Sequence, residues 1–181
     1  MDPVPQPATD RMVDFGGHPI VVGVVPGQPE LVVLTALSLA RAIGAPTLHL
    51  AYVDTARYVV EEHQDGTVTH APIDPDTADD TWQQTHDALE QHITHALGAA
   101  SLSWRLHYLA GRPDRALTHL ARAVDAAAIV VGTRAPGPAA RLRTPLEGSV
   151  AVHLSYHQHR PVLTVPLSVV DWKAIDAPWD H

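Results

Sequence analysis

The sequence contains no cysteine, few basic residues and no long apolar run. Without cysteine, disulfide bonds and thiolate chemistry with metals or redox partners are excluded. No apolar stretch approaches the roughly 20 residues of a membrane-spanning helix, so we expect no membrane contact. The 12 lysines and arginines are outnumbered by 20 acids, and the net charge is −8. This charge argues against nucleic acid as a partner, because a phosphate backbone binds to a basic surface.

The first residues also lack the features of a secretory signal, since acids and prolines stand where basic residues and an apolar core would be. We therefore expect a cytoplasmic protein. A chain of 181 residues, 45% of them hydrophobic, is long enough for one well-buried core. Residues 1–17 and 169–181 lack periodicity, so we predict one domain over residues 18–168 between two tails.

Apolar β-branched runs alternate with helical patterns along the chain. Five such runs predict strands, at residues 19–25, 47–53, 102–109, 127–131 and 161–165. Apolar positions at helical spacing predict helices at residues 29–43, 75–97, 113–124 and 149–156. The segment 56–73, with Asp65-Gly66 at its centre, predicts a small β-hairpin. This order predicts an α/β fold, a five-stranded doubly wound parallel sheet that is Rossmann-like, with helices on both faces.

The stretch from Ile129 to Val165 indicates where a ligand would bind. A buried strand ends at Gly132, and after a loop Gly148 and Ser149 open a short helix. Such ends leave backbone N–H groups and the positive end of a helix dipole facing one crevice. In doubly wound sheets the ligand lies at the carboxyl ends of the strands where the winding reverses, here between the first and fourth strands. We therefore predict an anion site, and phosphate is the ligand that suits it best.

Three arginines stand in this loop, within ten residues that contain no acid: Arg134, Arg141 and Arg143. A guanidinium can engage a polyphosphate bidentately. The alternatives are solvated side chains and ion pairs with acids of a partner subunit. We favour anion contact for one of the three.

These features together resemble the universal stress protein family, whose ATP-binding members carry a Gly-x2-Gly-x9-Gly-Ser/Thr motif after the fourth strand. The residues that carry the resemblance are Gly111-Arg112-Pro113, Ile129–Arg134, Gly148-Ser149-Val150 and Pro161–Val165. The resemblance covers about residues 19–166. It implies a stress-response module that binds an adenine nucleotide, ATP or similar, with magnesium, and that signals as a dimer.

The nucleotide site implied by the resemblance includes Gly132, Arg134, Gly137, Gly148, Ser149, Val150 and Val53. Gly137 enters because Ala135 stands where the motif has its second glycine, and the interval from Gly132 to Gly148 is three residues longer than in the motif. Ser149 either contacts phosphate or caps its helix. The two valines are either apolar neighbours of the base or plain core.

The end of the first predicted strand also departs from the family pattern, and this departure leaves functions other than nucleotide binding as alternatives. ATP-binding relatives place an Asp at the end of the first strand, where this chain has Val24-Val25-Pro26-Gly27. A buried partner left unpaired by this loss costs about 1–3 kcal/mol. The alternative function is a relative without nucleotide that acts through contacts with an unknown protein partner, and a weak ATPase is third. We predict no catalytic residue, because the sequence shows no general base or nucleophile motif.

The last predicted strand, Pro161–Val165, indicates a homodimer. It is short, β-branched and late in the chain, so we expect it at a sheet edge, and an apolar edge tends to pair with another. Members of the family commonly pair through this strand. The alternative is an edge covered by the tail from Val169 to Trp179.

The 13 histidines raise the question of a metal site. Two groups have a spacing that could hold an ion: His153, His157 and His159 near the last helix, and His92 and His95 on the second. No cysteine or carboxylate at matching spacing completes either group. We therefore predict no physiological metal site.

Overall fold

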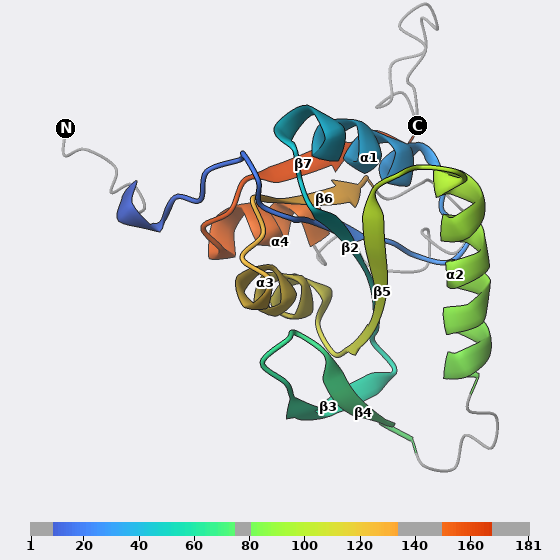
Figure 1. Cartoon of the computed structure of the whole chain (residues 1–181). Helices are drawn as coiled ribbons and strands as arrows, with labels where there is room; N and C mark the ends of the chain where they lie inside the picture. The colour runs from blue at the N-terminus through green and yellow to red at the C-terminus, as the bar shows by residue number, and fades with distance from the viewer. Residues whose placement is uncertain (1–8, 75–80, 134–149, 168–181) are drawn as a thin grey trace, which may run out of the picture.

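A five-stranded parallel sheet forms the centre of the protein (Figure 1). The structure, a computed structural model, describes residues 9–74, 81–133 and 150–167. The strands of the sheet are β1 (Ile20–Gly23), β2 (Thr47–Asp54), β5 (Ser103–Ala110), β6 (Ala128–Gly132) and β7 (Val162–Val165). Their order is β5-β2-β1-β6-β7, and each neighbouring pair is parallel. The predicted doubly wound sheet is confirmed, with β1 central and the winding reversed between β1 and β6.

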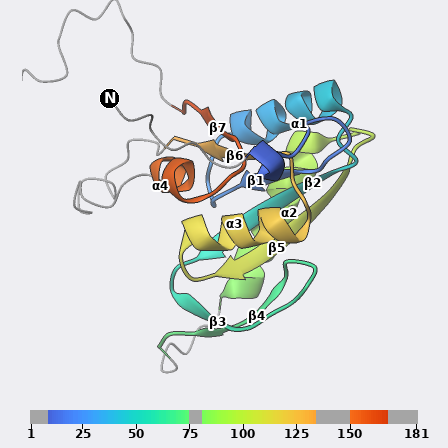
Figure 2. The same ribbon diagram turned by 90° about the vertical axis from the view of Figure 1, so that its left-hand side faces the viewer.

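Helices cover both faces of this sheet, as predicted (Figure 2). The helices are α1 (Leu31–Ile43) and α2 (Trp82–Leu97) on one face, and α3 (Pro113–Ala123) and α4 (Val150–His157) on the other. A short 3-10 helix, η1 (Thr9–Arg11), precedes β1. No helix among the described residues is long and apolar enough to span a membrane.

The central strand β1 is buried on both faces, which explains its uninterrupted β-branched sequence. Because side chains alternate along a strand, Val22 packs into the core under α1 and α2, and Val21 into the core under α3 and α4. Both side chains have no exposed surface. Two separate cores therefore hold the sheet between its helical layers.

Between β2 and α2 the chain makes the predicted hairpin, from strands β3 (Arg57–Glu62) and β4 (Val68–Pro72). The two strands pair antiparallel as a sheet of their own. In the turn, Asp65 Oδ1 accepts hydrogen bonds from the N–H (3.0 Å) and the hydroxyl (2.7 Å) of Thr67. Gly66 has a φ of +82°, and a Cβ there would lie 2.6 Å from Cδ1 of Leu120. Glycine is therefore needed at the hairpin tip for its backbone conformation and for its contact with α3.

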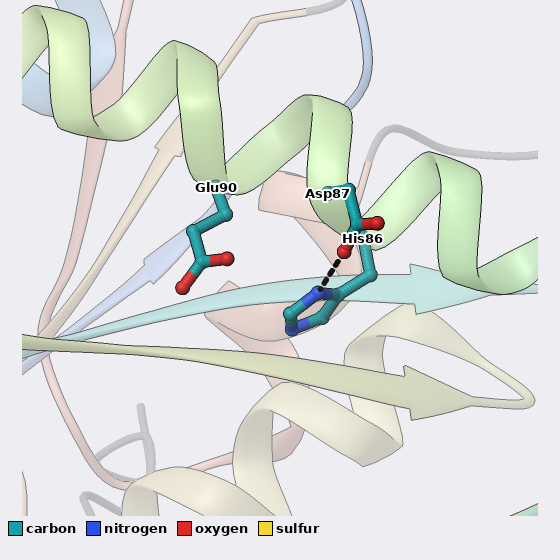
Figure 3. A group of neighbouring side chains, drawn as sticks. All are labelled: His86, Asp87 and Glu90. Atoms are coloured by element: carbon teal, nitrogen blue, oxygen red, sulfur yellow. Dashed lines mark hydrogen bonds and ion pairs between the residues drawn. The ribbon is translucent and has the colours of Figure 1, made fainter.

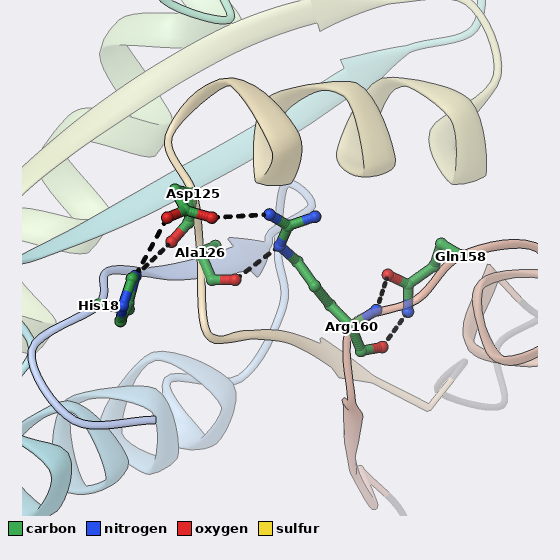
Figure 4. Close-up of polar contacts among 5 residues, drawn as sticks. All are labelled: His18, Asp125, Ala126, Gln158 and Arg160. Atoms are coloured by element: carbon green, nitrogen blue, oxygen red, sulfur yellow. Dashed lines mark hydrogen bonds and ion pairs between the residues drawn. The ribbon is translucent and has the colours of Figure 1, made fainter. Parts of the chain in front are cut away.

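Arg160, two residues before β7, fixes the last strand to the rest of the sheet (Figure 4). Its Nε donates to the carbonyl of Ala126 (2.6 Å), and its Nη2 donates to the carboxylate of Asp125 (3.1 Å). His18 Nδ1 lies 3.1 Å from the backbone oxygen of Asp125. The amide of Gln158 bonds to the backbone N–H and carbonyl of Arg160. The network joins the segment before β1, the turn before β6 and the start of β7.

Candidate functional site

The carboxyl ends of β1 and β6 form the crevice at which a doubly wound sheet binds its ligand. Gly23, the last residue of β1, pairs with Val131 of β6. The turn after β1 and the chain after Gly132 therefore leave the sheet side by side, as predicted. The turn is made by Pro26 and Gly27, and Gly27 has a φ of +72° that favours glycine.

A groove of about 490 Å³ opens between this turn and α2. Pro26 and Gly27 form one wall, and the other consists of Thr81, which precedes α2, and of α2 residues on one helical face: Gln84, Thr85, Ala88, Leu89 and His92. The hydroxyl, amide and imidazole groups provide both hydrogen-bond donors and acceptors. None of the described residues that line the groove is an acid. Its volume lies within the range of about 300–1,000 Å³ that small-molecule sites have.

Gly132 ends β6 at a place where a side chain has no room. A Cβ at this position would lie 2.7 Å from Nε2 of Gln28, 2.8 Å from Cδ1 of Leu167 and 3.0 Å from Cγ2 of Val32. Real Cβ atoms do not approach other heavy atoms to less than 3.0 Å. Packing is therefore one reason for a glycine at this position.

Val53 and Val150, predicted as base neighbours or core, both pack against the core under α3 and α4. Val53 pairs with Leu109 near the carboxyl end of β2, and Val150 is the first residue of α4. Neither lines the groove. The other predicted site residues, Arg134, Gly137, Gly148 and Ser149, lie outside the described residues, as do Arg141 and Arg143.

An aromatic cluster next to the groove holds the start of α2 on the sheet. The hydroxyl of Tyr108 donates to Asp54 Oδ2 (2.7 Å), and its ring centroid lies 5.6 Å from that of Trp82 and 5.3 Å from that of His70. The N–H of Ala56 also donates to Asp54 (2.9 Å). Burial, and then the hydrogen bond to Asp54, raise the pKa of Tyr108. The hydroxyl therefore remains a protonated donor at neutral pH.

Sequence reasoning missed the wall that α2 contributes. His92 and His95 have a spacing that could hold an ion, and the structure places His92, but not His95, in the groove. The side chain of His95 is 84% exposed, and its Nε2 lies 3.9 Å from the carboxylate of Glu30. Small and polar residues recur at helical spacing from Thr81 to His92, but a solvated helix face has the same pattern, so it does not by itself indicate a groove wall.

One group of the described side chains brings its donor atoms close enough to hold a metal ion (Figure 3). It consists of His86, Asp87 and Glu90 on α2, with donor atoms within 4.8 Å of one another. Both acids are exposed, and His86 Nδ1 already lies 3.4 Å from the carboxylate of Asp87. This is a different set from the histidines of the two sequence groups. The expectation that the chain has no physiological metal stays a prediction.

Comparison with known proteins agrees with this fold. The family model described as the universal stress protein family matches residues 17–166, whereas no curated protein sequence matches the chain. The structure of a universal stress protein from Archaeoglobus fulgidus is similar, with 22% sequence identity and a TM-score of 0.57. The match covers 82% of this chain and 98% of the Archaeoglobus chain.

Two similar structures contain nucleotides. One is the universal stress protein from Archaeoglobus fulgidus in complex with dAMP, with 19% sequence identity and a TM-score of 0.55. This match covers 82% of our chain and 97% of the Archaeoglobus chain. The other is a universal stress protein in complex with cAMP, with 22% identity, coverage of 84% and 99%, and a TM-score of 0.54. These likenesses show the shared fold, and the family match covers most of the length of the chain. The family match over residues 17–166, together with the order of the strands, shows that the chain belongs to the universal stress protein family.

Proposed function

We propose that this protein is a stress-response module that binds an adenine nucleotide at the carboxyl ends of β1 and β6. The observation that carries this proposal is the groove of about 490 Å³ between α2 and the turn that follows β1, the strand at which the winding reverses. The relatives in complex with dAMP and cAMP support an adenine nucleotide as the ligand.

The side chains of α2 suit the base and the sugar of such a ligand. A glutamine amide can bond to N6 and N7 of adenine at once, and Gln84 stands in the groove wall. The hydroxyls of Thr81 and Thr85 can donate to and accept from ribose. Because the described lining contains no carboxylate, it does not repel a phosphate. We assign the phosphates to Gly132 and to the residues predicted from the sequence, Arg134, Gly137, Gly148 and Ser149, with magnesium.

Filling the groove is expected to weaken nucleotide binding. Ala88→Trp places an indole on the groove wall of α2, and we expect the affinity for dAMP to fall at least tenfold, which corresponds to about 1.4 kcal/mol. Isothermal titration calorimetry with dAMP, cAMP and ATP measures this change. Gln83→Trp is the matched control, because residue 83 is exposed on the same helix and does not line the groove.

Two outcomes would count against this site. Equal affinities of Ala88→Trp and Gln83→Trp would place the nucleotide elsewhere. Absence of binding by the wild-type protein to all three nucleotides would favour the alternative function, a family member that acts through contacts with another protein.

We further propose that two copies of the chain pair through β7, which lies at a sheet edge. The carbonyl of Pro161 accepts a hydrogen bond from Ile129 of β6, and the carbonyl of Val165 accepts one from Thr133, the residue after β6. Because backbone groups alternate along a strand, the N–H groups of Val162 and Thr164 point to the outer side of β7, away from β6. Leu163 is 39% exposed. A two-fold axis would pair β7 antiparallel with β7 of the second copy.

Thr164→Pro is expected to convert this dimer into a monomer without unfolding the chain. Proline removes an N–H from the outer side of β7 and leaves the pairing with β6 in place. The change occurs twice at a symmetric interface, so we expect the dissociation constant to rise about a hundredfold. Sedimentation equilibrium measures it, and Thr164→Val, which keeps the N–H, is the control. A wild-type monomer, or a dimer that tolerates the proline, would contradict pairing through β7.

A further inference from the structure

A second cavity, of about 160 Å³, lies on the side of the sheet that α3 covers, away from the groove beside α2. Its walls come from the β3–β4 hairpin, from the carboxyl end of β5 and from the start of α3. In Figure 1 the hairpin stands beside these two elements. A cavity of about 150 Å³ in another protein binds benzene. This one therefore has room for an apolar group of about six carbons.

The inner wall of this cavity is apolar. Leu109 and Ala110, at the end of β5, line it and are buried. Val59 and Val68 of the hairpin and Ala116 of α3 are half-buried and complete the wall. None of these five side chains carries a hydrogen-bonding group. The wall therefore favours an aliphatic or aromatic group over a polar one.

Charged side chains stand at the solvent side of the cavity, and the two signs come from different elements. Glu62 belongs to β3, and its side chain is 58% exposed. Arg112, the residue before α3, and Arg115 in its first turn are exposed as well. The acid therefore stands on the hairpin wall, and the two arginines stand on the α3 wall.

These charged groups are available to a ligand. The guanidinium of Arg115 makes no hydrogen bond or ion pair with the residues that the structure describes. Oε2 of Glu62 lies 3.7 Å from Nδ1 of His119, which is too far for a hydrogen bond. Arg112 donates from Nε and Nη2 to Asp114 (3.2 and 2.8 Å) and keeps its other N–H groups. The cavity thus offers a carboxylate and guanidinium N–H groups that do not pair with each other.

This combination indicates the class of ligand. Guanidinium N–H groups suit a carboxylate, and the carboxylate of Glu62 suits an ammonium group. An α-amino acid carries both charges on one carbon, together with a side chain that the apolar wall can receive. A nucleotide suits the cavity less well, because Glu62 would repel its phosphates and drug-sized ligands occupy sites of about 300–1,000 Å³.

We propose that this cavity binds a free apolar α-amino acid as its zwitterion. Arg115, together with Arg112, holds the carboxylate, and Glu62 holds the ammonium group. The side chain of the amino acid lies against Leu109, Ala110 and the half-buried residues beside them. The site is independent of the proposed nucleotide groove, because the two share no lining residue.

Nuclear magnetic resonance titration of the full chain with leucine, without nucleotide, tests this site. The amides of Gly111 and Ala116, which line the cavity, should shift and saturate, and the amide of Gly27 in the groove should not. Isocaproate and isoamylamine are leucine without its ammonium group and without its carboxylate. Each lacks one charge-assisted hydrogen bond, so we expect each to bind about tenfold more weakly than leucine.

Two variants assign the charges to their partners. Arg115→Gln should lower the affinity for leucine about tenfold and leave that for isoamylamine unchanged. Glu62→Gln should also lower the affinity for leucine about tenfold but leave that for isocaproate unchanged. The matched controls are Arg122→Gln on α3 and Glu61→Gln on β3, which make the same chemical changes at exposed positions outside the cavity. Both controls should bind leucine like the wild-type protein.

Three results would overturn the proposal. One is the absence of saturation at about 10 mM leucine, tenfold above the millimolar affinity expected for so small a ligand. Another is isocaproate or isoamylamine binding as tightly as leucine, because the cavity would then select one charge rather than a zwitterion. The last is an equal loss of leucine affinity in Arg115→Gln and Arg122→Gln, which would place the amino acid elsewhere on α3.

Discussion

Replacing Gly132 with valine is expected to lower the free energy of unfolding by about 3 kcal/mol, the upper part of the range for overpacked sites. The first atom of the new side chain would lie 2.8 Å from Leu167 Cδ1 and 3.0 Å from Val32 Cγ2. Val32 has no exposed surface, and a β-branched residue in a helix has little freedom to change its rotamer. Urea denaturation of the protein without nucleotide measures this loss.

The control for this substitution is Gly16→Val. No heavy atom lies within 4 Å of the Cβ position at Gly16, so we expect a change of less than about 0.5 kcal/mol. Gly132→Ala should fall between the two valine variants. Equal stability of Gly132→Val and the wild-type protein would show that the side chains around Gly132 rearrange without cost.

This substitution separates two explanations of the same glycine. From the sequence, Gly132 allows close approach of a phosphate or ribose, or simply ends a strand. The structure shows that Gln28, Leu167 and Val32 occupy the space beside it. A large loss of stability of Gly132→Val in the absence of nucleotide would show that the glycine is needed for packing. The nucleotide affinity of this variant must then be corrected for the fraction of protein that is folded before it is compared with that of the wild-type protein.

The fold could be predicted because the strands of the sheet can be recognised from their own local sequence. Val21 and Val22 stand in a β-branched run that suits a strand buried on both faces, and the strand-helix alternation leaves few topologies. The hairpin was also predictable, because Asp65-Gly66 is a typical turn pair. These signals depend on neighbouring residues, which is why they can be read without knowledge of the tertiary structure.

The groove could not be predicted in the same way, and neither could the contact between Nδ1 of His49 on β2 and Nε2 of His107 on β5, which lie 2.9 Å apart. Thr81, Thr85 and His92 have the polarity of a solvated helix face, and only the packing of α2 beside the β1–α1 turn makes them a wall. His49 and His107 belong to strands 58 residues apart. Their contact depends on the register of β2 with β5, and no periodic pattern in either strand specifies that register.

The second large effect is expected at Tyr108, which ties the first turn of α2 to the sheet. Tyr108→Ala removes a ring that contacts Trp82 and His70, and we expect the free energy of unfolding to fall by about 3 kcal/mol. Because Trp82 begins α2, the groove wall should lose its position too, and affinity for dAMP should fall. Urea denaturation and calorimetry measure the two effects.

Tyr108→Phe separates the ring from the hydroxyl. It keeps the ring contacts but leaves the carboxylate of Asp54 without its 2.7 Å hydrogen bond, which we expect to cost about 2 kcal/mol. The affinity of this variant for dAMP, measured where it is fully folded, should stay close to that of the wild-type protein. A loss of affinity equal to that of Tyr108→Ala would mean that the hydroxyl, and not the ring, positions α2.

The free energy of unfolding, measured as a function of pH above about 10, gives an independent test of the Tyr108 hydroxyl. Since burial and Asp54 raise the pKa of Tyr108, the unfolded chain releases this proton first when the pH rises above about 10, the ordinary value for tyrosine. The folded state then binds more protons than the unfolded state, so stability falls as the pH rises. Tyr108→Phe should show a smaller fall, and part of it should persist because burial also raises the pKa of Tyr52. Identical alkaline profiles for both proteins would show that the Tyr108 hydroxyl is not held by Asp54 in solution.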